Sequence, residues 1–104
     1  VYDIFNLSIP NAFTPNDDGK NDGFAAWGIN VDPDNFEMII YDRWGNIMFH
    51  TDKWIVNHSE FWNGTLRNKG TDNDIVMDVY VYKIKLKELY GPKHIYIGRI
   101  ALIP

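Results

Sequence analysis

The stretch DVYVYKIKLKE, residues 78–88, decides the fold class, because its side chains alternate in character. The large apolar side chains lie on one side of an extended chain: Tyr80, Tyr82, Ile84 and Leu86. The other side carries three lysines: Lys83, Lys85 and Lys87. A period of two is the pattern of a strand with one buried face, and lysine is almost never buried without a partner. We therefore predict a strand with its lysine face in water.

The same period recurs on both sides of this stretch. FEMIIYD (36–42) places Phe36, Met38 and Ile40 on one face, and FNLSIP (5–10) does the same with Phe5, Leu7 and Ile9. HIYIGRIALIP (94–104) predicts a strand broken at Gly98, where a bulge or a close backbone approach is expected. Residues typical of tight turns occur in RWGN, NGT and YGPK. No pattern indicates a helix of three turns. We predict an all-β fold, an immunoglobulin-like antiparallel β-sandwich of about seven strands.

Composition restricts the function. The 104 residues fit a single domain, 1–104, and the net charge of −4 lacks the positive field that attracts nucleic acid. No apolar run approaches the roughly 20 residues of a membrane span, so we expect no membrane insertion. The start VYDIFNLSIP has neither an initiator Met nor a basic leader region, which favours a domain excised from a larger protein.

Residues with catalytic chemistry are few. The chain has no cysteine, and His58, Ser59 and Glu60 follow one another without a strained nucleophile turn. His50, His58 and His94 are scattered, without the spacing of a zinc site. We predict that the protein is not an enzyme and needs no cofactor.

An acidic loop, IPNAFTPNDDGKND (9–22), leaves two interpretations open. Oxygen ligands for calcium are available at Asn16, Asp18, Asn21 and Asp22. The loop does not fit an EF-hand, however, because alignment on Gly19 puts Ala25 where a bidentate Glu is required. The favoured alternative is a metal-free loop whose Asn and Asp side chains cap backbone amides.

The tryptophans also allow two interpretations. Trp27, Trp44, Trp54 and Trp62 would suit a stacking platform for sugar rings in a carbohydrate-binding or adhesin module. Packing in the core or at its edges is the favoured alternative, since a small domain has few places to bury an indole. Of the four, we expect Trp54 to be the most exposed.

The order of motifs closely resembles one family. The motifs that carry the resemblance are, in order, PNAFTPNDDGKND, YDRWGNIMF, FWNG, VYVYKI and GRIALI. The chain resembles the gliding-motility-associated C-terminal domain, which is the type B sorting domain of type IX secretion substrates. The resemblance runs from about Ile9 to Ile103. One departure is the pair Met77 and Asp78, where family members have a short Pro- or Gly-containing turn.

The resemblance implies a sorting signal rather than an enzyme. Such domains direct an N-terminally fused cargo across the outer membrane through the type IX translocon and an outer-membrane companion, to the cell surface or the medium. The signature residues of the family match the following positions: Pro10, Asn11, Phe13, Thr14, Pro15, Asn16, Asp18, Gly19, Asn21, Asp22, Asp42, Arg43, Trp44, Gly45, Trp62, Gly64, Tyr80, Tyr82, Gly98 and Leu102.

Arg43 stands out within this signature, because an always-charged guanidinium lies next to an indole. We expect it to stack on Trp44 and, if the acidic loop lies at the same end of the sandwich, to clamp Asp18 or Asp22.

Overall fold

The computed structural model describes residues 4–14, 23–70 and 74–103. This part of the chain is all-β, with seven strands and one 3₁₀ turn: β1 (Asn6–Ser8), β2 (Ala12–Phe13), β3 (Trp27–Ile29), β4 (Val31–Tyr41), β5 (Ile47–Thr51), η1 (Leu66–Asn68), β6 (Val79–Glu88) and β7 (Lys93–Leu102). None of its described residues form a helix of the length and apolarity that a membrane crossing requires. The predicted all-β class and strand number are confirmed.

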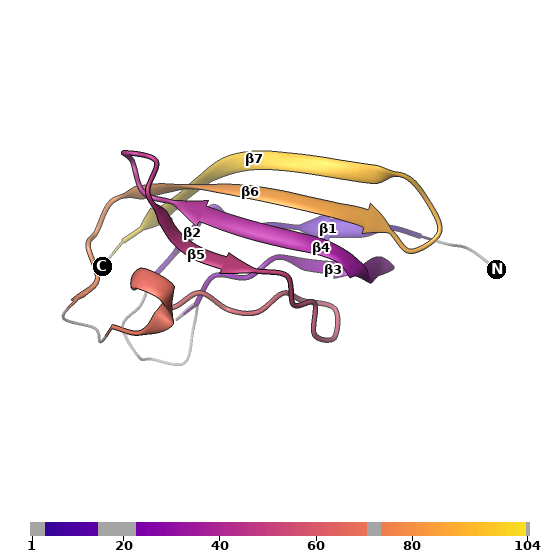
Figure 1. Cartoon of the computed structure of the whole chain (residues 1–104), viewed down its shortest axis with the longest axis horizontal. Coiled ribbons are helices and arrows are strands. Elements are labelled where there is room, and N and C mark those ends of the chain that lie inside the picture. The colour runs from indigo at the N-terminus through magenta and orange to yellow at the C-terminus, as the bar shows by residue number, and fades with distance from the viewer. Residues whose placement is uncertain (1–3, 15–22, 71–73, 104) are drawn as a thin grey trace.

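The strands form two sheets (Figure 1). Five strands lie in the order β2-β7-β6-β4-β5, and β1 pairs with β3 in a separate antiparallel sheet behind them. The prediction of purely antiparallel pairing is wrong at one place, because β2 runs parallel to β7. Only two residues of β2 pair, Ala12 with Ala101 and Phe13 with Leu102, so no periodic pattern marks this strand.

An irregular segment extends the smaller sheet. Phe24 and Trp62 exchange two backbone hydrogen bonds of 2.8 and 2.9 Å, and the Ser59 amide donates to the Ala26 carbonyl. A single bridge also joins Trp27 to His58. Residues 57–62 therefore lie beside residues 24–28, and residues 54 and 55 pair back onto 58 and 59, so that this segment completes a second layer without forming a regular strand.

The core lies between the two layers, and the predicted faces are confirmed. Phe36, Met38 and Ile40 of β4 are buried, as are Tyr80, Ile84 and Leu86 of β6. The lysines of β6 lie on the opposite, outer face of the sheet: Lys83, Lys85 and Lys87. Phe5, Leu7 and Ile9 pack against the core from the N-terminal segment.

Strand β7 is not broken at Gly98. Its register with β6 is continuous from Lys93, opposite Lys87, to Ala101, opposite Val79, so the expected bulge is wrong. The expected close approach is confirmed in another form, because the side chain of Tyr82 occupies the space above Gly98.

The tryptophans are distributed differently from the expectation. Trp54 is half-buried against Phe36, with ring centroids 5.0 Å apart, so the prediction that it is the most exposed is wrong. Trp44 is the most exposed, at 76%. Trp62 is fully buried, and Trp27 lies on the surface of the second layer.

Candidate recognition site

The β4–β5 turn, Asp42–Asn46, is held by one carboxylate. Oδ1 of Asp42 accepts hydrogen bonds from the amides of Trp44 and Asn46, both 2.9 Å, and Oδ2 accepts one from the Asn46 side chain, also 2.9 Å. The backbone amides of Asp42 and Gly45 close the turn on Asn46 and Asp42 respectively. Gly45 has a φ of 87°, a left-handed conformation that glycine adopts without strain. The turn is therefore rigid although it is exposed.

These hydrogen bonds also set the charge of the turn. Donation from the Asn46 side chain is the largest effect that lowers the pKa of Asp42, and the backbone amides of the turn lower that pKa further. Asp42 is therefore ionised at neutral pH. Its negative charge lies at the base of the turn, next to the positive charge of Arg43.

Arg43 and Trp44 project from this turn. The Arg43 guanidinium carbon lies 5.4 Å from the centroid of the Trp44 ring, which confirms the expected stacking. The Arg43 side chain is 60% exposed and forms a 3.5 Å ion pair with Asp78, so it is not a desolvated clamp. The expected contacts with Asp18 or Asp22 lie outside the described residues.

Other signature residues are buried and serve the fold. Phe13 and Tyr80 pack edge-on against Trp62, with centroid distances of 5.7 and 5.1 Å. The Trp62 indole donates to the Thr65 carbonyl at 2.8 Å, which satisfies its only polar atom. A Cβ at Gly64 would lie 3.1 Å from Leu102, and the φ of Gly64 is 94°, so this turn requires glycine on two counts.

The structure brings most of the described signature to one end of the sandwich. Tyr41 pairs with Val81 beside the Asp42 turn, Val79 pairs with Ala101, and Phe13 pairs with Leu102. The 89–92 turn between β6 and β7 lies at the opposite end (Figure 1). Pro10 and Asn11 precede β2 at the signature end, where the Asn11 carbonyl accepts a hydrogen bond from the Ala101 amide. Thr14 is the last described residue before the acidic loop.

The rest of the signature loop lies outside the described residues: Pro15, Asn16, Asp18, Gly19, Asn21 and Asp22. The possible calcium site falls on four of these. Elsewhere, in residues 4–14, 23–70 and 74–103, no three His, Asp or Glu side chains gather in the manner of a metal site.

The Ser59 hydroxyl is committed to the backbone. It is fully buried, accepts a hydrogen bond from the Ala26 amide at 3.0 Å and donates to the Glu60 carbonyl at 3.1 Å. The Nδ1 atom of His58 lies 2.7 Å from the Ser59 carbonyl rather than beside the hydroxyl. These residues do not form a nucleophile and base.

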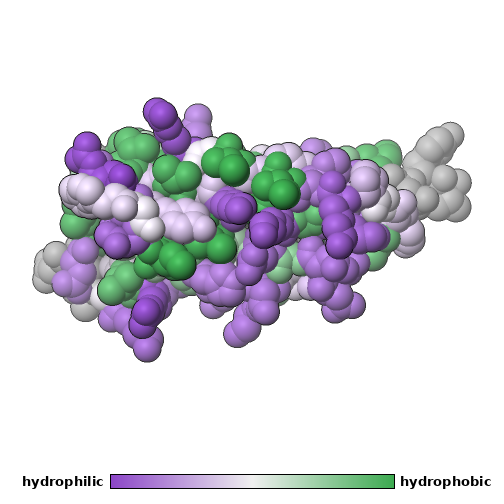
Figure 2. Space-filling model, turned by 45° about the horizontal axis from the view of Figure 1, so that its top comes forward, coloured by the Kyte–Doolittle hydropathy of each residue, from purple (hydrophilic) through white to green (hydrophobic). Residues whose placement is uncertain are grey.

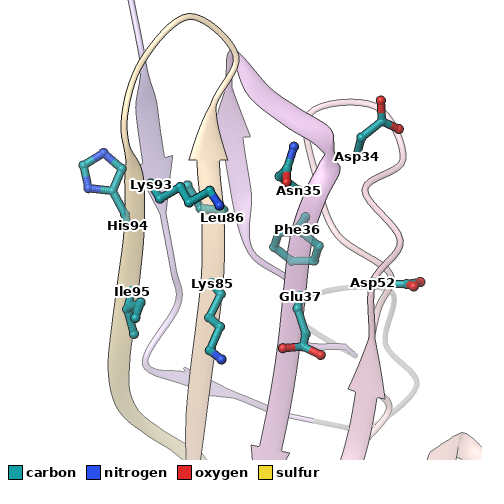
Figure 3. Close-up of a pocket in the computed structure, with 10 residues that line it drawn as sticks. All are labelled: Asp34, Asn35, Phe36, Glu37, Asp52, Lys85, Leu86, Lys93, His94 and Ile95. Atoms are coloured by element: carbon teal, nitrogen blue, oxygen red, sulfur yellow. The ribbon is translucent and has the colours of Figure 1, made fainter.

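A shallow hollow of about 480 Å³ lies where β4 bends between Val31 and Phe36. It is lined by residues of β4, β6 and β7 and by Asp52 in the loop after β5 (Figure 3). Asp52 points away from β6 and His94 points away from β4, whereas Glu37 and Lys85 lie opposite each other on the neighbouring strands β4 and β6 (Figure 3).

Two residues that contact the turn, Asn46 and Asp78, were not predicted from the sequence. Asn46 completes the Asp42 hydrogen bonds, and the Asp-to-Asn spacing of an Asx turn was the available signal. Asp78, noted only as a departure from the motif, is the residue that pairs with Arg43. No local pattern predicts that contact, because 35 positions separate the two residues in the sequence.

Comparison with protein-family models identifies a family for most of the chain. The family model described as CHU_C type IX secretion signal domain matches residues 7–100. No curated protein matches the chain.

Proposed function

The chain belongs to the CHU_C type IX secretion signal domain family, and we propose that the turn Asp42–Asn46 is the surface through which the secretion machinery recognises it. The family is non-catalytic. Membership implies fusion to a cargo, interaction with the secretion machinery and secretion across the outer membrane.

The proposal is supported by one observation: some of the signature residues are buried in the core and others are exposed to solvent. Phe13, Trp62 and Leu102 are buried, so packing alone accounts for them. Arg43 and Trp44 are exposed, and the fold gains little from an indole in water. Tryptophan and arginine are the residues that most often dominate binding energy at interfaces.

Rigidity favours the same surface. The Asp42 carboxylate fixes the backbone that presents Arg43 and Trp44, and the guanidinium lies over the indole. A surface that is already ordered loses less conformational entropy when a partner binds. It also distinguishes this domain from other β-sandwiches more sharply than a flexible tail would.

We propose that the domain binds the type IX translocon and a dedicated outer-membrane companion protein. The fused cargo is then delivered to the cell surface or the medium. We expect the remainder of the signature loop, Pro15–Asp22, to contribute to the same surface, because Thr14 leads into it from β2. An immunoglobulin-like arrangement of the two layers is part of the same proposal, and it is supported by the core enclosed between the two sheets.

A second candidate function rests on the second layer. Trp27 and Phe61, 44% and 40% exposed, lie edge-to-face at 5.7 Å. His58 contacts both rings, and Asn57 lies in the groove beside Trp27. Exposed rings beside an amide suit a sugar ring, so a carbohydrate-binding role predicts retention on a glycan array that Trp27→Ala abolishes.

Export of a fused reporter tests the proposed function. A soluble reporter with an ordinary signal peptide and residues 1–104 at its C-terminus should reach the surface or medium of a host with a type IX system and its companion protein. It should stay in the periplasm when the translocon is deleted. Retention of a folded, undegraded fusion in the intact host would overturn the partner and destination proposals.

A further inference from the structure

The outward edge of β7 is open over most of its length. Strand β2 pairs with β7 only at Ala101 and Leu102, and the strand continues back to Lys93. In Figure 1, β7 forms the upper boundary of the five-stranded sheet. No described residue pairs with the outward side of β7 between Lys93 and Gly98.

The hydrogen bonds at the C-terminal end of β7 identify which backbone groups face outward. The amides of Ala101 and Ile103 donate to Asn11 and Phe13, on the β2 side, whereas the Leu102 amide donates to Asp78. The register with β6 has no irregularity, so the alternation extends along the whole strand. The N–H and C=O groups of Ile95, Ile97 and Arg99 therefore point away from β6, and no backbone group of the described residues pairs with them.

The side chains of the same residues make this edge apolar at its centre and basic at its ends. Ile95 and Ile97 are 63% and 69% exposed, and Lys93 and Arg99 flank them. Neither Lys93 nor Arg99 forms an ion pair within the residues that the structure describes. Figure 2 shows apolar and hydrophilic groups interleaved on the face that adjoins this edge.

A second copy of this chain is a poor occupant of the edge. Two β7 edges paired antiparallel about their centres would place Lys93 opposite Arg99, and parallel pairing in register would place each cation opposite itself. Like charges directly opposite one another destabilise a strand pair. Cations on an edge strand are also a common protection against self-association.

We propose that the open edge of β7 binds an extended segment of a partner protein by strand addition. That segment carries acidic side chains six residues apart and two apolar side chains between them, on one face. The acids would lie opposite Lys93 and Arg99, and the apolar groups beside Ile95 and Ile97. On the neighbouring strand, Lys83 and Lys85 lie next to the two isoleucines and favour the same negative charge. Main-chain hydrogen bonds supply affinity in this mode, and the alternating side chains supply specificity.

A synthetic peptide, acetyl-ETVTVTE-amide, tests the proposal on the isolated chain. Its addition should shift the NMR amide signals of Ile95, Ile97 and Arg99 more than those of Tyr96 and Gly98, whose amides face β6. The peptide KTVTVTK, with the end charges reversed, should bind at least about tenfold more weakly because it meets like charges at both ends. Equal binding of the two peptides, or no shift at millimolar ETVTVTE, would overturn the proposal.

A pair of variants at one position separates the backbone from the side chain. Ile97→Pro removes an outward N–H without removing a bond to β6, and edge strands accept proline at such positions. It should weaken ETVTVTE binding about tenfold, because one carbonyl of the peptide loses its donor. Ile97→Thr keeps the N–H and should bind nearly as well as the wild type.

Circular dichroism establishes whether each variant is folded. If Ile97→Pro does not fold, the comparison of ETVTVTE with KTVTVTK on the wild-type chain still tests the proposal. Equal loss in both variants would show that only the side chain matters and would contradict strand addition. Concentration-dependent shifts without peptide would assign the edge to a second copy instead. The edge lies away from the Asp42 turn, so neither result depends on the proposed recognition surface.

Discussion

The side chain of Tyr82 covers Gly98 across the β6–β7 pair, so that a Cβ at position 98 would lie 2.5 Å from Tyr82 Cζ. The ring also contacts Phe24, with centroids 6.0 Å apart, so it is held between the neighbouring strand and the core. Glycine at this position is therefore required by one neighbouring side chain rather than by a backbone turn.

Gly98→Ala should destabilise the fold by about 1–3 kcal/mol, because the Tyr82 ring must leave its position to admit a methyl group. Chemical denaturation measures the change. In a Tyr82→Ala background the same substitution should cost much less, since the obstructing ring is gone. Equal costs in the two backgrounds would contradict the contact.

Asp42→Asn should make the free energy of unfolding less dependent on pH in the acidic range. The pKa of Asp42 in the folded protein is lower than its ordinary value of 3.8, so its ionised form contributes stability above that value. The contribution is lost as the pH falls through the pKa of the folded state. The stability difference between wild type and Asp42→Asn should therefore be constant above about pH 5 and shrink below about pH 4. A difference that persists at pH 2 would contradict the role of the charge.

Arg43→Ala should change the free energy of unfolding by less than about 1 kcal/mol, because its ion pair with Asp78 is largely in water. A double-mutant cycle with Asp78→Ala measures the coupling energy of the pair. A loss of about 2–4 kcal/mol would instead indicate a desolvated partner for Arg43, such as Asp18 or Asp22.

Chelation should leave the melting midpoint unchanged, since we expect Asn16, Asp18, Asn21 and Asp22 to cap backbone amides rather than bind calcium. Thermal melting with and without EDTA measures this. A lower midpoint in EDTA that excess calcium restores would show a metal bound by the folded state.

The periodic strands could be predicted from the sequence because burial of one face leaves a record in every second residue. Met38 and Ile84 were placed correctly for that reason. Strand β2 could not be predicted, since two paired residues carry no period. Residues 54–62 form part of a layer through scattered backbone bonds, which leave no side-chain pattern.

The residues of the candidate site could be predicted from the sequence, but their exposure to solvent could not. The motif identified Arg43 and Trp44, and their adjacency suggested stacking. Whether the guanidinium is buried depends on which distant residue reaches it, and that residue is Asp78. Exposure of Trp44 rather than Trp54 likewise depends on the packing of Phe36.

A matched pair of aromatic substitutions tests whether the secretion machinery recognises the Asp42–Asn46 turn. Trp44 and Tyr90 are 76% and 66% exposed, and they lie in turns at opposite ends of the sheet. Neither Trp44→Ala nor Tyr90→Ala should change stability by more than about 0.5 kcal/mol, as is usual for surface positions.

The deciding measurement is the fraction of reporter exported when residues 1–104 carry either substitution, with melting of each purified domain measured in parallel. We expect Trp44→Ala to lower export at least about tenfold, as loss of an interface hot spot would. Tyr90→Ala should export like the wild type. Undiminished export of a folded Trp44→Ala domain would show that the Asp42–Asn46 turn is not the surface that the secretion machinery recognises.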